Sequence, residues 1–285
     1  MSNLAEKEAK AIQRLQSFEP EDGYFLAYSG GKDGDVIKIL ANLACVKFEA
    51  VHSLTTADAP ETINYIKSQP DVRIERHRYK DGTHKTMWNL IENKLTPPLR
   101  QSRYCCAELK EASGAGKVTI TGVRWAESTR RKSHSDVVQM IGKPKTTQKL
   151  AEEIGADYAV TKQGGLIMNE DNAETRRMVE LCYRTRKTIV NPIVEWADDD
   201  VWNFLRHYGC RSNPLYECGF RRVGCIGCPM AGKAMRKFEF DRYPTFKLAY
   251  THAFDRMLER RKERGMQISN GRDTGEELFD WWVNG

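Results

Sequence analysis

The sequence predicts an α/β protein with an open, doubly wound and mostly parallel sheet, followed by a helical, cysteine-containing C-terminal part. Strand-like apolar runs alternate with helix-like amphipathic segments through the first half of the chain. A glycine-rich turn at residues 29–33 joins the first of these strands, residues 24–28, to a helix that continues through residues 36–40. Repeated strand–helix units favour a parallel sheet, because neighbouring parallel strands need a crossover connection.

The spacing of apolar residues assigns the other elements. A leading helix is expected at residues 4–17, where apolar side chains recur at close to helical spacing. Residues 59–66 form an expected helix with proline in its first turn. The remaining segments follow the same periodicities: strands at 47–52, 72–74 and 117–121, and helices at 84–93, 197–205 and 243–264.

The regular pattern weakens between residues 126 and 187, where glycine, proline and dense charge interrupt it. This stretch is expected to be an insertion or a cap over the site. Regular structure returns at residue 188. The chain is therefore divided into an α/β part at residues 1–187, which includes the cap, and a C-terminal part at residues 188–285.

Composition indicates a folded protein that does not span a membrane. Of 285 residues, 29% are charged and 40% hydrophobic, and no apolar run approaches the roughly 20 residues that a membrane span needs. The first residues lack the apolar core of a signal peptide, so a cytoplasmic location is expected. Thiols stay reduced there, and the eight cysteines are not expected to form disulfides. The net charge of +6 permits nucleic-acid binding without requiring it.

Ser29, Gly30, Gly31, Lys32 and Asp33 form a candidate phosphate site. Two glycines let backbone N–H groups approach phosphate oxygens with no Cβ in the way, and the following helix N-terminus adds partial positive charge. The lysine adds a full charge. The spacing fits neither the Walker loop nor the dinucleotide fingerprint. An ordinary tight turn between strand and helix is the alternative.

This loop resembles the pyrophosphate loop (PP-loop) of the adenine nucleotide α-hydrolase superfamily, which holds the phosphates of ATP or of an adenylated sulfate. The resemblance implies that residues 1–187 are a nucleotide-binding domain with that superfamily's fold, and that residues 29–34 hold the phosphates. The last loop position is usually serine in the superfamily and is Gly34 here. Glycine removes one hydroxyl donor to phosphate.

Four of the cysteines form two pairs. Cys225 and Cys228 stand in a Cys-x-x-Cys on a glycine-rich turn, and Cys105 and Cys106 are adjacent. Four thiolates can converge on one metal centre. The same turn also fits a redox dithiol or half of a zinc site, and the residues by themselves do not separate iron from zinc.

Residues 22–232 resemble the phosphoadenosine phosphosulfate (PAPS) reductase family. Six ordered blocks carry the resemblance: residues 29–33, 58–62, 103–110, 122–131, 191–202 and 213–228. In the adenylyl-sulfate branch of that family, a vicinal cysteine pair and a Cys-x-x-Cys bind a 4Fe-4S cluster. The resemblance therefore implies Cys105, Cys106, Cys225 and Cys228 as the cluster ligands. Zinc is the alternative metal.

The resemblance also implies roles around the nucleotide. Arg124 and Arg131 are expected to contact the nucleotide or its leaving group, since a planar guanidinium matches a phosphate. Lys32 is expected to stabilise charge on pyrophosphate. Asp33 is expected to hold Mg²⁺, with a helix-capping role as the alternative. Two further residues complete the nucleotide-binding set: Asp58, expected on ribose or metal, and Gly122.

Reductases of this family use a nucleophilic cysteine near the C-terminus, and this sequence has no cysteine after Cys228. The expected function is therefore sulfur activation and transfer, in which ATP is cleaved between its α and β phosphates to adenylate an acceptor that is then thiolated. The expected partners are an adenine nucleotide, tRNA or DNA as acceptor, and a sulfur-donor protein, with a homodimer left open. PAPS or adenylyl-sulfate reduction is the alternative reaction. A non-catalytic nucleotide sensor or nucleic-acid-binding subunit is the alternative of another class.

Overall fold

The computed structural model describes the following residues: 4–127, 137–141, 152, 159–160, 166–168, 187–266 and 271–284. The chain forms two compact units that are interleaved along the sequence. The first unit comprises Met1–His52, Asn64–Ile74 and Gly114–Val223, and the second comprises Ser53–Ile63, Glu75–Ser113 and Gly224–Gly285. The domain division expected after residue 187 stays a prediction.

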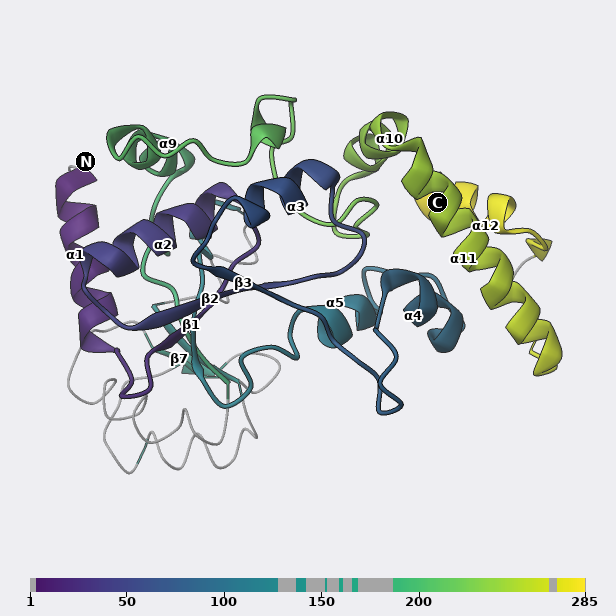
Figure 1. Ribbon diagram of the computed structural model, residues 1–285, viewed down its shortest axis with the longest axis horizontal. Coiled ribbons are helices and arrows are strands. Elements are labelled where there is room, and N and C mark those ends of the chain that lie inside the picture. Colours follow the sequence, from purple (N-terminus) through teal and green to yellow (C-terminus); the bar gives the residue numbers. More distant parts are fainter. Residues whose placement is uncertain are drawn as a thin grey trace. The chain divides into compact units, whose positions relative to one another are not determined.

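The described strands form one eight-stranded sheet in the order β3-β2-β1-β4-β8-β5-β7-β6 (Figure 1). Their bounds are β1 Tyr24–Ala27, β2 Phe48–Ser53, β3 Val72–Glu75, β4 Val118–Ile120, β5 Val138–Ile141, β6 Ala159–Val160, β7 Leu166–Met168 and β8 Lys187–Val190. β1 pairs in parallel with β2 and with β4, and β4 pairs in parallel with β8. The antiparallel pairs are β5 with β8, β5 with β7, and β6 with β7. The expected open, mostly parallel α/β fold is confirmed.

The helices of the first unit cover this sheet and bury its apolar side chains. Their bounds are α1 Leu4–Ser17, α2 Lys32–Leu43, α9 Asp198–His207, and the short 3₁₀ helices η1 Trp125–Glu127 and η2 Pro214–Tyr216. Helix α3, Pro60–Lys67, begins in the second unit and ends in the first. α2 packs against both α1 and α9. Leu26 of β1, Ile37 of α2 and Phe204 of α9 meet in one core in which Trp196 is fully buried.

The second unit is mainly helical and has an aromatic core. Its helices are α4 Met87–Lys94, α5 Tyr104–Leu109, α10 Lys233–Arg242, α11 Pro244–Glu263 and α12 Gly275–Asn284. α11 packs against α4 and against α12, beside which it runs in Figure 1. The centroid of the Tyr250 ring on α11 lies 5.0 Å from the ring centroid of Trp88 and 4.8 Å from that of Trp282. The apolar face of this long helix is therefore core.

No helix in the described part of the chain combines the length and the apolar character that crossing a membrane requires.

Candidate functional site

The loop between β1 and α2 lies where the strand order reverses. β1 has β2 on one side and β4 on the other, and the connection that leaves β1 runs away from the one that leaves β4. Ligands of open α/β sheets bind at the carboxyl ends of strands next to such a reversal. Residues 28–31 follow β1 and residues 121–124 follow β4. The fold thus places the predicted phosphate loop and the predicted arginine on adjacent strands.

The backbone of the loop leaves the N-terminus of α2 open. Gly30 has a φ of +74°, in the left-handed region that glycine adopts without strain. The Asn213 side-chain amide donates to the carbonyl oxygen of Gly30 at 3.0 Å and so supports this turn. Gly31 is the N-cap of α2 and has no side chain that could cap the helix. Uncapped backbone N–H groups and the helix dipole together make such an end suited to an anion.

The sequence did not predict that Tyr216 contacts the loop. Its hydroxyl oxygen accepts from the backbone N–H of Lys32 at 3.0 Å. A Cβ on Gly31 would lie 3.1 Å from that oxygen, so glycine allows this close approach. Tyr216 stands in one of the blocks that carry the family resemblance. Its place in that block indicated a functional role in general, but it did not predict the contact with Lys32.

Two cations and two carboxylates form a network beside the loop. Lys32 Nζ lies 3.2 Å from Asp33 Oδ2 and 3.2 Å from Asp198 Oδ1. Arg124 donates through Nε to Asp33 Oδ1 and through Nη2 to Asp198 Oδ1, both at 2.7 Å. Formal charge within these four side chains sums to zero. A phosphate at the loop would therefore compete with the carboxylates for both cations.

Burial and charge act in opposite directions on this network. Only 1% of the Arg124 side chain is exposed, compared with 66% for Asp198. Burial lowers the pKa of Arg124, but the charges of Asp33 and Asp198 and its hydrogen bonds to them outweigh burial and raise it. Burial raises the pKa of Asp198, but hydrogen bonds from Arg124 and Lys32 outweigh burial and lower it. Arg124 and Asp198 are therefore both ionised at neutral pH.

Two of the predicted binding glycines have packing reasons to be glycine. A Cβ on Gly122 would lie 2.6 Å from Asp33 Cβ, so any side chain would push the end of β4 away from α2. A Cβ on Gly34 would lie 3.1 Å from Tyr28 Cδ2. The missing serine hydroxyl at position 34 thus follows from the aromatic ring beneath the loop. Nucleotide contacts of both glycines stay predictions.

Arg131 and Asp58 are the remaining residues that were predicted to contact the nucleotide. Arg131 lies outside the described residues. Asp58 belongs to the second unit, where its carboxylate accepts from the backbone N–H and the hydroxyl of Thr55, both at 2.8 Å. Its backbone forms a bridge to Cys225. The binding of ribose or metal by Asp58 stays a prediction.

All four paired cysteines belong to the second unit. A hydrogen bond between the Cys105 and Cys106 thiols raises the pKa of Cys105, and burial and the charges of Cys106, Cys225 and Cys228 raise it further. The same hydrogen bond lowers the pKa of Cys106 to about 6, with help from the positive charge of Lys110. Since Cys105 responds to the other three sulfurs, the two pairs lie within electrostatic reach of each other.

The sequence likewise did not predict that Lys110 contacts one of the paired cysteines. Its ammonium lies beside the sulfur of Cys225, whose charge raises the pKa of the lysine. Cys225 also contacts the Thr55 hydroxyl at 3.3 Å. Burial raises the pKa of Cys225, and Lys110 opposes that rise. A cation next to a buried sulfur favours the thiolate, the form that binds metal.

The four paired cysteines are the predicted metal ligands. Within the described ranges, no three His, Cys, Asp or Glu side chains are arranged around one ion position. A tetrahedral zinc with bonds of about 2.3 Å needs its sulfur ligands within roughly 4 Å of one another. A four-iron cluster occupies more space, so its ligands stand further apart, and four cysteine thiolates are its usual ligand set. Binding of a 4Fe-4S cluster by the four cysteines stays a prediction, as does the zinc alternative.

Comparison with known sequences finds distant relatives. An uncharacterised protein of Methanocaldococcus jannaschii is 25% identical over 99% of this chain and 57% of its own length. An adenosine 5′-phosphosulfate reductase of Staphylococcus saprophyticus is 20% identical over 70% of this chain and 62% of its own length. The chain spans about half the length of the curated relatives it matches first.

Comparison with solved structures finds weak likenesses. A PAPS reductase of Candida auris in complex with phosphate has a TM-score of 0.40 at 13% identity, covering 71% of this chain and 80% of that one. FMN adenylyltransferase of Candida glabrata with FMN and an ATP analogue has a TM-score of 0.43 at 15% identity, covering 79% and 64%.

The family match covers the phosphate loop and all four paired cysteines. The model of the phosphoadenosine phosphosulfate reductase domain matches residues 23–231, which is more than half of the chain. This range includes the β1–α2 loop, Arg124, the vicinal pair on α5 and the Cys-x-x-Cys. The chain belongs to the phosphoadenosine phosphosulfate reductase family within the PP-loop superfamily.

Proposed function

We propose that the chain is an enzyme of sulfur activation and transfer that binds an adenine nucleotide at residues 29–34. The observation that carries this proposal is the uncapped N-terminus of α2 behind a diglycine turn, with Lys32 and Arg124 beside it. Family membership supports a nucleotide as the anion bound there.

In the proposed reaction, a nucleophilic atom of the acceptor attacks the α-phosphorus of ATP. The bond from that phosphorus to the oxygen bridging the β-phosphate breaks, and pyrophosphate leaves with the electron pair. A sulfur nucleophile from the donor then displaces AMP from the adenylated acceptor. Lys32, the loop amides and the arginines Arg124 and Arg131 would stabilise the negative charge that develops on pyrophosphate.

Nucleotide binding would rearrange the charge network. Lys32 and Arg124 would exchange carboxylate oxygens for phosphate oxygens. Asp198 is the partner given up most readily, because 66% of its side chain is exposed to water. Asp33, freed from Lys32, would bind Mg²⁺ directly or through water, since Mg²⁺ usually bridges ATP phosphates and one or two carboxylates.

We also propose that Cys105, Cys106, Cys225 and Cys228 hold a 4Fe-4S cluster, with zinc as the alternative metal. Such a cluster supplies one-electron redox chemistry when bound. Lys110 would offset the negative charge of the ligating thiolates, because its ammonium already lies beside Cys225. Asp58 and Thr55 would hold the backbone that carries Cys225.

The second candidate is reduction of PAPS or adenylyl sulfate, which family membership favours. A nucleotide sensor without turnover is the third. One assay series separates the three. Anaerobically purified protein is analysed for iron and sulfide, then incubated with ATP and either tRNA or DNA, or with adenylyl sulfate and a thiol reductant.

Acceptor-dependent formation of AMP and pyrophosphate supports the sulfur-transfer enzyme, with loss in Lys32→Ala and retention in Lys47→Ala. Lys47 is the matched control, because its side chain is exposed in the same unit. Sulfite formed from adenylyl sulfate would select the reductase instead. Nucleotide binding with no product in any arm would select the sensor.

A further inference from the structure

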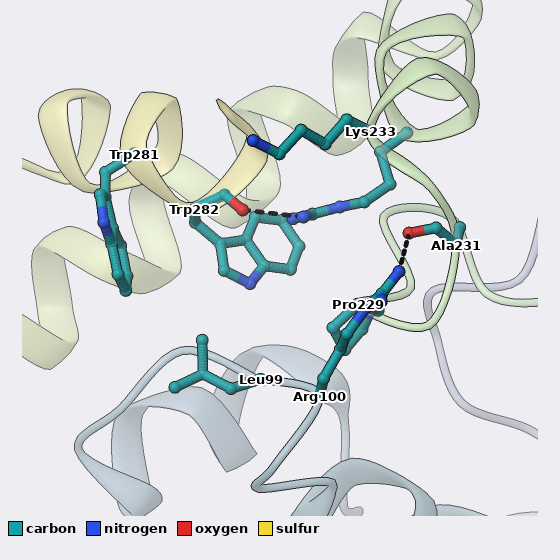
Figure 2. A pocket seen from close by; sticks show the side chains of 8 residues that line it. Leu99, Arg100, Pro229, Ala231, Lys233, Trp281 and Trp282 are labelled. Carbon is teal, nitrogen blue, oxygen red and sulfur yellow. Dashed lines mark hydrogen bonds between the residues drawn. The ribbon is translucent and has the colours of Figure 1, made fainter. Parts of the chain in front are cut away.

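A cavity of about 350 Å³ lies within the second unit (Figure 2). Its lining includes none of the residues proposed to bind the nucleotide phosphates or the cluster, although Pro229 in its wall directly follows Cys228. Three cationic side chains line it: Arg100 before α5, and Lys233 and Arg236 on α10. Trp281 and Trp282 of α12 line it as well. Figure 2 shows Trp281, Lys233 and Arg100 around the same space. The cavity thus combines basic groups with aromatic surface.

The three cations bond to carbonyl oxygens instead of carboxylates. Arg100 Nε donates to the Pro229 carbonyl at 2.9 Å. Lys233 Nζ donates to the Asn284 carbonyl at 2.9 Å, and Arg236 Nη1 donates to the Trp282 carbonyl at 2.8 Å. No carboxylate in the described part of the chain forms an ion pair with any of the three. Within the described residues, none of the three is neutralised by a direct ion pair, although the charges of Glu239 and Cys228 also act on Arg236.

Among the three cations, Arg236 provides the strongest argument for an anionic ligand. Only 7% of the residue is exposed, and its guanidinium lies 4.1 Å from the centre of the Trp282 ring. Its Nε and Nη2 atoms are shielded and make no hydrogen bond to a described residue. Glu239, one turn further along α10, accepts from the backbone N–H of Gly227 at 2.8 Å. A buried cation with unused donors is costly unless an anion compensates it.

The start of α10 and the size of the cavity indicate which class of anion would bind there. α10 begins at Lys233 and no side chain caps it, so its positive dipole end adds to the three charges. The cavity volume is about ten times the roughly 30 Å³ that one water molecule occupies in the liquid. It therefore has room for an oxyanion together with the group that carries it. Guanidinium and ammonium groups are the usual partners of phosphate.

We propose that this cavity binds a phosphate group carried on a larger ligand, with the phosphate between Arg100, Lys233 and Arg236 and the attached group against Trp281. The ligand is either a free mononucleotide or one unit of a single-stranded nucleic acid, since both present a phosphate joined to a planar base. Tryptophan rings stack on such bases. The site is separate from the loop at residues 29–34, and its existence does not depend on the proposed reaction.

The test uses the full chain labelled with 5-fluorotryptophan, because ¹⁹F NMR resolves the six tryptophans individually. Trp281→Phe and Trp282→Phe variants assign the two relevant signals. The probes are inorganic phosphate, AMP and a twelve-nucleotide single strand of DNA or RNA. Saturable shifts of the Trp281 and Trp282 signals are expected with AMP or the oligonucleotide.

Lys233→Met is expected to weaken that binding about tenfold, the size of one charge-assisted contact. Lys237→Met is the matched control, since it removes the same charge from an exposed position on the same helix. Arg236→Met is a second, independent variant, and circular dichroism checks that it folds. Tighter binding of the oligonucleotide than of AMP would assign the site to nucleic acid, and the reverse would assign it to a mononucleotide. The proposal is overturned if neither phosphate ester shifts the two signals, or if Lys233→Met and Lys237→Met weaken binding equally.

Discussion

Gly34 shows how one side chain sets the chemistry of the loop. The Tyr28 ring lies beneath it, and the Tyr28 hydroxyl is fixed because it donates to Asp35 Oδ1. A Cβ at position 34 would stand 3.1 Å from Tyr28 Cδ2. The ring has little freedom to move, since Asp35 also accepts from Ser212. Glycine therefore avoids a close contact that a Cβ would make unless the Tyr28 ring shifted.

Gly34→Ser is accordingly expected to destabilise the chain by about 1–3 kcal/mol, the usual cost of overpacking. It is not expected to strengthen nucleotide binding, although it restores the hydroxyl common in the superfamily. Urea unfolding and titration with an ATP analogue measure the two effects. Gly224→Ala is the control, because a Cβ there meets no atom within 4 Å. Tighter binding by Gly34→Ser at unchanged stability would contradict the packing argument.

Asp198 forms ion pairs with Lys32 and Arg124 beside the loop, so its removal should favour an incoming phosphate. An ion pair with an exposed carboxylate is worth about 0–1 kcal/mol. Asp198→Asn is therefore expected to raise pyrophosphate affinity roughly twofold to fivefold. Calorimetric titration with pyrophosphate measures this change. Asp199→Asn removes the same charge from the next exposed residue of α9 and should leave the affinity unchanged. Equal effects of the two variants would show that only net charge matters.

The sequence predicted the loop itself better than its surroundings. Residues 29–33 could be assigned because the glycine spacing and the flanking apolar runs are local features. The pairing of Arg124 with Asp198 joins residues 74 positions apart, and no local pattern reports it. The contacts of Tyr216 and Lys110 could not be predicted for the same reason. Asp198 falls within the helix expected at residues 197–205, but no site role was predicted for it.

At the scale of elements, α1 is held by a buried ion pair. Arg14 of α1 donates to the Pro192 carbonyl at 2.9 Å and to Glu195 Oε2 at 2.8 Å. Burial raises the pKa of Glu195, but the hydrogen bond and charge of Arg14 and a smaller effect of Lys10 outweigh burial and lower it. A lowered carboxyl pKa means that the folded state favours the ionised form more than the unfolded state does.

The stability from Glu195 is therefore fully present above the ordinary glutamate pKa of about 4.3 and is lost as pH falls through the lower folded value. Glu195→Gln should be less stable than the wild type at pH 7, and the difference should shrink below about pH 4. Urea midpoints at pH 7, 5, 4 and 3 measure this. Glu6→Gln, an exposed position on α1, serves as the control. A constant difference at every pH would exclude the ion pair as its cause.

Helices and strands with a clear periodicity of apolar residues could be predicted from the sequence. Elements that depend on tertiary contacts could not. The helix expected at 4–17 is α1, and that expected at 84–93 is α4 at Met87–Lys94. β5 was missed because it lies in the stretch where periodicity fails. α12 was missed although Gly275 marks its start. A Cβ there would lie 2.3 Å from the Thr251 carbonyl oxygen, so that glycine serves a helix–helix contact that the sequence does not reveal.

At the scale of the whole molecule, the loop and the cysteine set belong to different compact units. Damage to one is therefore expected to spare the other. Lys32→Ala should abolish nucleotide turnover and keep the wild-type iron content, whereas Cys228→Ser should lose iron and still bind an ATP analogue. Iron analysis and calorimetric titration on both variants measure this separation.

Cys210→Ser is the control for the cysteine variant, because Cys210 lies in the first unit and outside the proposed ligand set. It should keep both properties. Loss of iron and of nucleotide binding together in either Lys32→Ala or Cys228→Ser would indicate general misfolding, and the two-unit account would then be wrong.

The central claim is that backbone amides at the start of α2 bind the phosphates of a nucleotide. Hydrogen–deuterium exchange with and without α,β-methylene ATP tests it most directly, with adenosine as the ligand that lacks phosphates. Slower exchange at residues 30–35 is expected with the ATP analogue and not with adenosine. Unchanged exchange at these residues under saturating analogue, or equal protection by adenosine, would contradict the claim.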